Sequence, residues 1–428
     1  MPSLFADLQF RGLVHQMSDP SLAAKLDGGG LVAYIGFDPT SDSLHVGSLL
    51  QLCLLKRLQE GGHQPIALAG GGTGMIGDPS GKSQERPLLE PEELDANVAG
   101  IRAQLSRFLD FSPNSSTTRA LLLDNRVWLE PLGLISFLRD IGKHFTVNQM
   151  ISKESVRARL ERPETGVSFT EFSYMLLQAY DFLYLFDHYN CRLQLGASDQ
   201  WGNITMGIDL IRRVREATAW GLTTPLVVKP DGSKFGKTES GVVWLDPSKT
   251  SPYQFYQFFL RTEDSVVGTY LRYFTFLDHE EILALEESVK SHPERREAQR
   301  VLAREVCTLV HGDSATHQAE MASQALFSTE VDQLEEETLL EVFKEAPSTT
   351  LPKSFLDGSP SMSDAFVLTG LAPSKKMART VISQGGGYLN NRRVTDSSRP
   401  LGPGDLLCGR YMILRKGRKE HHLIRFES

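Results

Sequence analysis

Apolar and polar positions in the first half of the chain predict strands and helices in turn. Residues 31–37 (LVAYIGF) and 65–70 (PIALAG) are short apolar runs typical of buried strands. Residues 48–60 (SLLQLCLLKRLQE), between them, repeat apolar side chains at helical spacing and end at a pair of glycines. Together they predict a strand–helix–strand unit of a parallel sheet. Such sheets bind ligands beyond the carboxyl ends of their strands, so residues 36–48 are the predicted ligand site.

Farther along the chain the apolar spacing becomes mainly helical. Residues 172–186, 204–216 and 253–325 are predicted to be largely helical. The segment that starts at Glu330 (EVDQLEEETLLEVFKEAPSTTLPKS) is acidic and then rich in Pro, Ser and Thr, which is typical of a linker. After it, residues 372–394 (APSKKMARTVISQGGGYLNNRRV) predict a basic helix, a turn and a strand.

The composition excludes several classes of protein. With 428 residues, 40% hydrophobic and 23% charged, the chain is an ordinary globular protein of two or three domains. Its first residues lack the pattern of a signal peptide, and no apolar stretch approaches the roughly 18 residues of a membrane span, so we expect a cytoplasmic protein. Four widely spaced cysteines indicate neither zinc nor disulfides and are predicted to be core thiols: Cys53, Cys191, Cys307 and Cys408.

Charge is unevenly distributed along the chain. The net charge is −8, yet residues 375–428 hold twelve Lys or Arg against four acids and so carry +8, which leaves −16 for the rest. A basic module on an acidic body indicates binding to phosphate groups, most simply those of a nucleic acid. The alternative is a solvated basic surface.

Two glycine motifs look like nucleotide-binding sequences but do not fit well. GTGMIG, residues 72–77, matches the dinucleotide fingerprint, but it runs into Asp-Pro-Ser-Gly, which breaks the helix that the pyrophosphate needs. An NAD-dependent enzyme therefore stays only as an alternative. GDPSGKS ends like a P-loop, but the earlier glycine that this motif requires is replaced by Ile76.

A histidine stands where the predicted strand–helix–strand unit turns into its helix. His45 and Gly47 lie at the start of a helix expected from about Ser48, where unpaired N–H groups attract anions. Thr40 and His45 could donate to phosphate oxygens, and a flat base could lie against Gly47. The alternative is a purely structural helix cap.

A second motif, which bears lysines, favours the phosphate interpretation. Residues 229–241 (KPDGSKFGKTESG) form a glycine-rich segment with Lys234, Lys237 and the hydroxyl of Thr238 close together. Cationic loops of this kind close over phosphates.

Polar side chains also recur on one face of an apolar helix. In FSYMLLQAYDFLYLF, Tyr174, Gln178 and Asp181 are spaced by four and three residues, which places them on the same side. A carboxylate among Phe, Met, Leu and Tyr needs a partner, so a pocket is favoured over a polar surface face.

These motifs carry a resemblance to a known family. HVGS and KFGKT resemble the two signatures of class I aminoacyl-tRNA synthetases. YIGFDPTSDSLHVG, GDPSGK, FTEFSYMLLQAYDF, SDQWGNI and KFGKTESG are similar to segments of the bacterial tyrosyl-tRNA synthetases, in the same order and over essentially the whole chain. The basic tail resembles the S4-like RNA-binding domain of that family.

The resemblance implies an α/β fold in several parts. It predicts a Rossmann-like parallel-sheet catalytic domain over 1–228, with an insertion around 125–170. An α-helical anticodon-side domain with the signature loop follows over 229–328. A linker over 329–352 leads to a small α+β S4-like domain over 353–428.

The resemblance also implies roles for individual residues. Around tyrosine it implies Tyr34 and Asp181 at the phenol hydroxyl, Asp78, Tyr174 and Gln178 at the α-amino group, and Gln200 near the carboxylate or the α-phosphate. Around ATP it implies Asp38, His45, Gly47, Ser48, Lys237 and, at the ribose, Asp199, for which a helix cap is the alternative. The residues implied to grip the β- and γ-phosphates, and so to be catalytic, are Thr40, His45, Lys234, Lys237 and Thr238. For tRNA it implies Lys375, Lys376, Arg379, Arg392 and Arg393.

The implied reaction is tyrosine activation by ATP with Mg²⁺, followed by transfer to tRNA(Tyr), in a homodimer with no tightly bound cofactor, no protein-held metal and no membrane contact. An alternative is a synthetase-derived RNA-binding protein without catalysis. The sequence departs from the family pattern at Ile35, Ser48 and Ala197, where cysteine, histidine and glycine are usual. All three lie near the implied ribose and adenine site.

Overall fold

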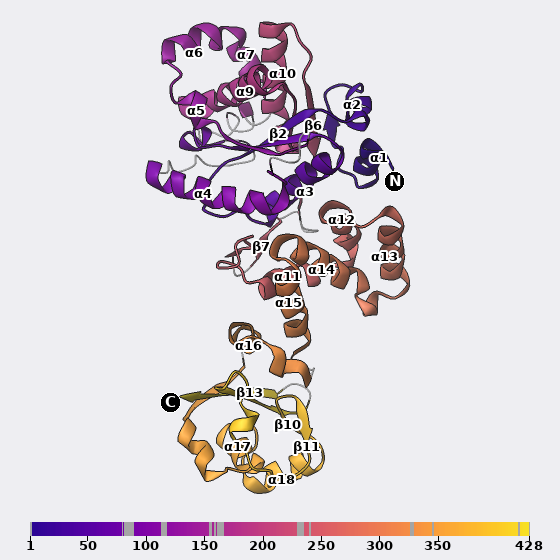
Figure 1. Ribbon diagram of the computed structural model, residues 1–428, viewed down its shortest axis with the longest axis vertical. Helices are drawn as coiled ribbons and strands as arrows, with labels where there is room; N and C mark the ends of the chain where they lie inside the picture. The colour runs from indigo at the N-terminus through magenta and orange to yellow at the C-terminus, as the bar shows by residue number, and fades with distance from the viewer. Residues whose placement is uncertain are drawn as a thin grey trace. The chain divides into compact units, whose positions relative to one another are not determined.

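The chain folds into two compact units, which are described separately. A computed structural model describes residues 2–78, 80, 90–112, 118–153, 156–157, 160, 167–228, 235–238, 241–325, 329–344, 346–417 and 420–427. The first unit comprises residues 1–251 and 259–310, and the second comprises 252–258 and 311–428 (Figure 1).

A six-stranded sheet forms the centre of the first unit. Its order is β1-β6-β5-β2-β3-β4; all neighbours are parallel except β1 and β6. The chain runs from β2 to β3 and β4 on one side and through β5 and β6 on the other, so the order reverses between β2 and β5. The strands are β1 Gln16–Met17, β2 Val32–Phe37, β3 Gln64–Ala69, β4 Leu121–Asp124, β5 Cys191–Ala197 and β6 Trp220–Thr224.

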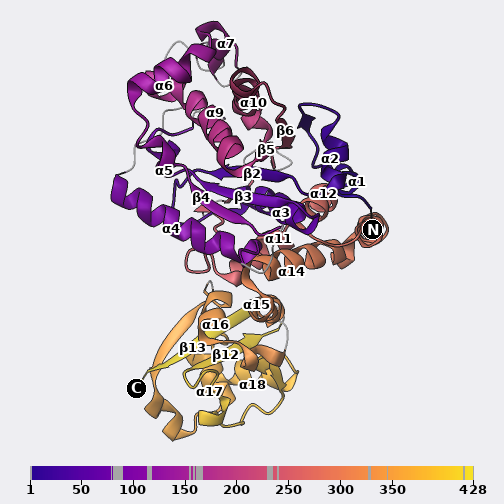
Figure 2. The ribbon, with the colours of Figure 1, turned by 45° about the horizontal axis from the view of Figure 1, so that its top comes forward.

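Helices cover both faces of this sheet. In Figures 1 and 2, α3 (Val46–Glu60) and α4 (Pro91–Phe108) lie on one face, and α9 (Phe169–Tyr189) and α10 (Trp201–Arg215) lie on the other. The predicted strand–helix–strand unit is confirmed as β2-α3-β3. The helix begins at Val46, two residues before the expected start, because His45 caps it.

The remaining helices of the first unit precede β2, fill the insertion or follow the sheet. The N-terminal ones are α1 (Leu4–Phe10) and α2 (Leu22–Gly28). The predicted insertion contains α5 (Arg126–Leu129), α6 (Leu134–Asp140) and α7 (Val147–Ile151). After the sheet come a small β7–β8 pair (Lys237–Thr238 and Gly241–Val242), α12 (Asp264–Phe274), α13 (His279–Ser291) and α14 (Glu297–His311).

The second unit packs helices around a five-stranded sheet of order β11-β10-β12-β13-β9, in which only β13 and β9 are parallel. Its strands are β9 Ser348–Pro352, β10 Gly387–Leu389, β11 Arg392–Val394, β12 Tyr411–Lys416 and β13 Glu420–Glu427. Its helices are most of α11 (Pro252–Leu260), α15 (Asp313–Ala325), α16 (Glu336–Val342), α17 (Met362–Leu368) and α18 (Lys375–Ser383), with 3₁₀ turns η5 (Thr329–Gln333), η6 (Lys353–Gly358) and η7 (Pro403–Asp405). The α/β fold with a small α+β C-terminal part is therefore as predicted.

The expected linker over 329–352 is wrong. This segment forms η5, α16 and β9, and β9 pairs with β13 inside the sheet. Val331, Leu339 and Phe343 are buried in a hydrophobic cluster with Ile413 and other side chains of the sheet. The C-terminal unit thus begins well before residue 353, and the helical segment 253–325 is divided between the two units.

Two other expectations concern burial and the membrane. Cys53, Cys191 and Cys307 are buried thiols as predicted, but Cys408, in the turn between η7 and β12, is exposed. In the described part of the chain, no helix has both the length and the apolar character that crossing a bilayer requires.

Candidate active site

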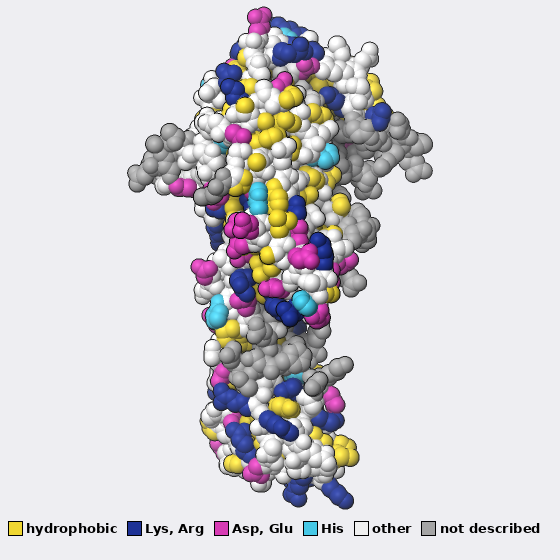
Figure 3. Space-filling view, turned by 90° about the vertical axis from the view of Figure 1, so that its right-hand side faces the viewer, with side chains coloured by type: hydrophobic (Ala, Val, Ile, Leu, Met, Phe, Trp, Pro, Cys, Tyr) yellow, Lys and Arg dark blue, Asp and Glu magenta, His cyan; other side chains and the backbone are white. Residues whose placement is uncertain are grey.

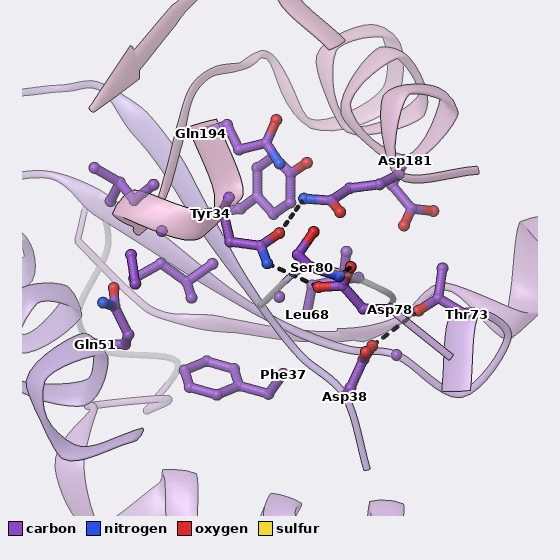
Figure 4. Close-up of a pocket in the computed structure, with 18 of the residues that line it drawn as sticks. Tyr34, Phe37, Asp38, Gln51, Leu68, Thr73, Asp78, Ser80, Asp181 and Gln194 are labelled. Atoms are coloured by element: carbon purple, nitrogen blue, oxygen red, sulfur yellow. Dashed lines mark hydrogen bonds between the residues drawn. The ribbon is translucent and has the colours of Figure 1, made fainter. Parts of the chain in front are cut away.

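A cavity of about 290 Å³ lies at the carboxyl ends of β2 and β5, where the strand order reverses (Figure 4). Eight of the predicted site residues line it: Tyr34, Asp38, Asp78, Tyr174, Gln178, Asp181, Asp199 and Gln200. Thr40, His45, Gly47 and Ser48 are not among its lining residues. The residues predicted for tyrosine are therefore brought together, whereas those of the first signature lie outside this cavity.

Asp181 is a buried carboxylate held by neutral donors. Its side chain is 2% exposed, its Oδ2 accepts from Asn125 Nδ2 at 2.9 Å, and its Oδ1 accepts from Trp128 Nε1 at 2.7 Å. Burial raises the pKa of Asp181 to about 7, although both hydrogen bonds act in the opposite direction. The sequence interpretation missed Asn125 and Trp128, whose only signal is that they follow directly after β4.

Tyr34 brings a second polar group to the same part of the cavity. Its side chain is 1% exposed, and its hydroxyl has no hydrogen-bond partner among the described residues. Burial, with the nearby Asp181 and Cys191, raises the pKa of Tyr34 well above its usual value. The hydroxyl therefore stays neutral, and a buried hydroxyl without a partner is costly unless a ligand supplies one.

Amide side chains link the carboxylate of Asp78 to α9 and α10. Gln200 Nε2 donates to Asp78 Oδ2 at 2.7 Å, and Gln178 Nε2 donates to Gln200 Oε1 at 3.3 Å. Asn203 Nδ2 donates to Gln178 Oε1 at 2.9 Å. Asn203 lies one helical turn after Asp199 and was not predicted. Its bond fixes which way the Gln178 amide points.

Tyr174, which is predicted to lie at the α-amino group of tyrosine, contacts the carboxylate of Asp38. Its hydroxyl donates to both carboxylate oxygens of Asp38, each at 3.2 Å. Thr73 Oγ1 also donates to Asp38 Oδ1, at 3.3 Å (Figure 4). Burial, together with Asp38 and Asp78, raises the pKa of Tyr174. Asp38, Asp78 and Asp181 thus converge on one cavity, which favours a ligand with a cationic group.

His45 acts as a helix cap, the alternative that the sequence left open. Its Nδ1 accepts from Gly47 N at 2.9 Å, so in the neutral ring the proton is on Nε2, which can donate. A Cβ on Gly47 would lie 2.6 Å from the ring, so the glycine is needed for this contact. Thr40 is exposed, in the turn between β2 and α3.

The second signature is anchored beside the first. Lys234 lies outside the described residues, and of Lys237 and Thr238 only the backbone, in β7, is described. Phe235 packs against Tyr270 and Phe274, with ring centroids 5.0 and 5.4 Å apart. Gly236, at φ 83°, lies against Val46, and Val46 N donates to Val243 O at 3.0 Å. The root of the loop therefore meets the start of α3.

Of the remaining predicted positions, some line the cavity and others do not. Asp199 lies within the turn η3 (Ser198–Gln200) and is not the N-cap of α10, so the cap interpretation is wrong. Ile35 and Ala197 line the cavity, whereas Ser48 does not. GTGMIG contains only the short turn η1 (Thr73–Met75), without the helix that a dinucleotide site needs. In the described parts of the chain, no cluster of His, Cys, Asp or Glu suits a metal ion.

Comparison with known proteins identifies the family. Residues 27–328 match the family model of class I tRNA synthetases for tryptophan and tyrosine, and residues 338–424 match the C-terminal domain of tyrosine–tRNA ligases. The chain belongs to the tyrosine–tRNA ligase family. It is 55% identical to the tyrosine–tRNA ligase of Roseiflexus castenholzii, over 99% of this chain and 100% of the relative, and 50% identical to that of Bacillus caldotenax, over 99% of both.

Solved structures agree with this assignment. A C-terminally truncated mitochondrial tyrosyl-tRNA synthetase from Aspergillus nidulans is 32% identical, with a TM-score of 0.67 over 76% of this chain and 95% of that one. The tyrosyl-tRNA synthetase of Archaeoglobus fulgidus shares the fold, at 16% identity and a TM-score of 0.54 over 74% of this chain and 99% of that one. The predicted class I enzyme that ligates tyrosine to tRNA is thereby confirmed.

Proposed function

We propose that the described cavity binds L-tyrosine with its phenol group at Tyr34 and Asp181. The observation that carries the proposal is the buried Tyr34 hydroxyl without a partner, close to a carboxylate whose own partners are neutral. A phenol hydroxyl can donate to Asp181 and accept from Tyr34 at once, so tyrosine would satisfy both groups. Phenylalanine would leave the Tyr34 hydroxyl unpaired and would offer Asp181 no further donor.

The other end of the cavity suits an α-ammonium group. Asp78, Tyr174 and Gln178 would contact it, and the carboxylates of Asp38 and Asp78 supply the negative charge that balances it. Gln200, which bonds both Asp78 and Gln178, would lie at the substrate carboxylate or the α-phosphate. The hydrogen bonds among these side chains support a site that is formed before the substrate enters.

ATP would bind beside the tyrosine pocket, near the start of α3. Asp38, His45, Gly47, Ser48, Asp199 and Lys237 are the proposed contacts, with Asp199 at the ribose. The anchoring of β7 and β8 at Val46 supports the idea that both signatures act on one triphosphate. Tyrosine carboxylate attacks the α-phosphate to give tyrosyl-adenylate and pyrophosphate, and the terminal ribose of tRNA(Tyr) then takes the tyrosyl group.

Catalysis would rest on charge stabilisation during that attack. Negative charge grows on the pyrophosphate, and donors aimed at it lower the barrier because they bind the transition state more tightly than the ground state. The proposed donors are Thr40, His45 through its Nε2–H, Lys234, Lys237 and Thr238. Mg²⁺ would accompany ATP rather than occupy a site made of protein side chains.

Transfer RNA would bind the C-terminal unit. Lys375, Lys376, Arg379, Arg392 and Arg393 are all exposed, on α18 and β11. Figure 3 shows Lys and Arg side chains on the visible face of this unit.

Exposed apolar side chains in the predicted insertion support a homodimer. Val127, Leu134, Ile135 and Phe169 are 71%, 68%, 74% and 77% exposed, which is unusual for large apolar side chains that lie in one region of the chain. We expect a second copy to cover them, in a cytoplasmic enzyme.

Pyrophosphate exchange driven by tyrosine tests the function. The wild-type protein should exchange labelled pyrophosphate into ATP only when tyrosine is present, and Asp181→Ala should not. A protein that binds tRNA(Tyr) without any exchange would instead be the non-catalytic RNA-binding protein that the sequence left open as an alternative.

A further inference from the structure

The C-terminal unit contains a second cavity, of about 420 Å³, which tyrosine activation does not use. Its lining comes from the β10–β11 hairpin, from residues 394–399, and from η7 with the two leucines that follow it. Asp332, in the segment that was expected to be a linker, completes one wall. Its volume is within the range of about 300–1,000 Å³ that is typical of small-ligand sites.

Part of the cavity lining is apolar and fixed by the core of the unit. Leu389, Val394 and Leu407 line the cavity and are 3%, 7% and 5% exposed. They belong to two hydrophobic clusters of the C-terminal unit. These side chains are therefore held in place and give the cavity a firm apolar surface, against which a flat ring could lie.

Three arginines add hydrogen-bond donors whose positions are also held. Arg392 donates to Asp332 Oδ2 at 2.7 Å, Arg399 donates to Asp405 Oδ1 at 2.6 Å, and Arg393 Nε donates to the carbonyl of Gly385 at 3.0 Å. Each guanidinium has five N–H groups, and among the described residues these bonds use only part of them. The side chains of Arg392 and Arg399 remain 67% and 39% exposed, so both are accessible to a ligand.

The charge balance of the lining decides which chemistry fits. Three arginines are matched by three aspartates, Asp332, Asp396 and Asp405, so the cavity has no excess of positive charge and does not suit a phosphate by itself. A nucleobase fits better: its faces stack on guanidinium planes and apolar side chains, and its edges offer both donors and acceptors. Phosphates on either side could meet the exposed basic residues of α18.

We propose that this cavity receives one unstacked nucleotide of the bound tRNA, with its base between the arginines and the apolar wall. The proposal rests on the proposed binding of tRNA to this unit and makes it more specific. The cavity would then contribute part of the affinity for tRNA. A neutral side chain that fills it would remove this part without changing the charge of the protein.

Two glycines provide a matched test. A Cβ built on Gly404, which lines the cavity, has no atom within 4 Å, and the same holds for Gly402, which does not line it. Neither residue has a positive φ, so both accept a side chain without backbone strain. Gly404→Phe should fill the cavity, and Gly402→Phe is the control.

The measurement is the affinity of the full-length protein for a tRNA(Tyr) transcript at several salt concentrations. Gly404→Phe should weaken binding by about 5- to 150-fold, which is the range for loss of one stacked base, without a change in the salt slope. Gly402→Phe should bind like wild type. Equal affinities of the two variants would overturn the proposal. If Gly404→Phe fails to fold, Thr395→Trp, at an exposed position of the lining, takes its place.

Three further measurements separate failure of the cavity proposal from failure of tRNA binding to this unit. Acylation probing of 2′-hydroxyls should find one tRNA nucleotide whose reactivity changes on binding wild type and returns to its free value with Gly404→Phe. Micromolar binding of a free nucleoside monophosphate, with tRNA affinity unaffected by Gly404→Phe, would contradict the RNA assignment. Replacement of Lys375, Lys376 and Arg379 by Ala tests the unit itself: if only this variant weakens binding, the cavity proposal alone fails, and if neither does, binding of tRNA to the unit fails as well.

Discussion

Asp181 and Tyr34 are the residues on which amino-acid choice should depend, because both are buried and neither has a charged partner. Tyr34→Phe removes one neutral hydrogen bond, worth about 0.5–1.5 kcal/mol, so tyrosine activation should fall by about tenfold or less while activation of phenylalanine stays the same or rises. Asp181→Ala should abolish activation. Steady-state exchange with both amino acids measures the ratio, and an unchanged ratio in Tyr34→Phe would show that the phenol group binds elsewhere.

The raised pKa of Asp181 predicts how stability varies with pH. The ordinary pKa of 3.8 applies to the unfolded chain and about 7 to the folded one, so between these values the unfolded state binds fewer protons. Stability of the ligand-free protein should therefore fall as pH rises through this window, by at most about 4 kcal/mol from this group. Asp181→Asn removes the contribution.

Melting temperatures of wild type and Asp181→Asn, measured from about pH 5 to pH 8, check this expectation. The difference between them should shift in favour of the variant as pH rises and level off above about pH 7. A difference that stays constant over the range would mean that Asp181 is already ionised in the folded protein at low pH.

Residues of one helix could be predicted from the sequence, but residues that meet from different elements could not. Tyr174, Gln178 and Asp181 follow helical spacing and do line one cavity. Asn125 and Trp128 hold Asp181 from the end of β4, more than fifty positions away in the chain, and no local pattern reports such a contact.

At the scale of elements, the lysine-bearing loop is expected to act on ATP and not on tyrosine. Its root is fixed at the start of α3, at Val46, outside the tyrosine cavity. Lys234→Ala and Lys237→Ala should each raise the barrier to adenylate formation by about 2–4 kcal/mol, with tyrosine affinity nearly unchanged. Stopped-flow measurement of adenylate formation decides it. Unchanged rates in both variants would leave the loop only a structural role.

Composition misled the prediction of one element. The segment 329–352 is acidic and rich in Pro, Ser and Thr, as linkers are, but its few apolar residues carry the structure. Leu334, Leu339 and Phe343 are almost fully buried against β12 and β13. A count of residue types averages over such positions, whereas packing depends on where each of them faces.

At the scale of the whole molecule, the exposed apolar residues of the insertion predict the oligomeric state. Ile135→Asp puts a charge at a site that is 74% exposed in one copy but would be buried between two, so it should shift the protein toward monomers. Leu283→Asp, at an apolar site on α13 that is 50% exposed, is the control and should stay dimeric. Sedimentation velocity measures both. A monomeric wild type, or dissociation of both variants alike, would place the interface elsewhere or remove it.

The uneven charge of the chain predicts that substitutions can impair tRNA binding and leave tyrosine activation intact. A deletion from residue 353 would remove the partners of β9 and of the buried residues of η5 and α16, so substitution of exposed side chains is the cleaner test. Replacement of Lys375, Lys376 and Arg379 by Ala should leave tyrosine-driven pyrophosphate exchange intact. It should also weaken tRNA binding and reduce its salt slope by up to about 3, because each phosphate contact contributes roughly 0.7–0.9. Replacement of Lys290, an exposed lysine on α13 of the first unit, is the control. If the slope of the triple variant equals that of wild type, α18 carries a solvated basic surface. If exchange is lost as well, these residues support the fold that both activities need.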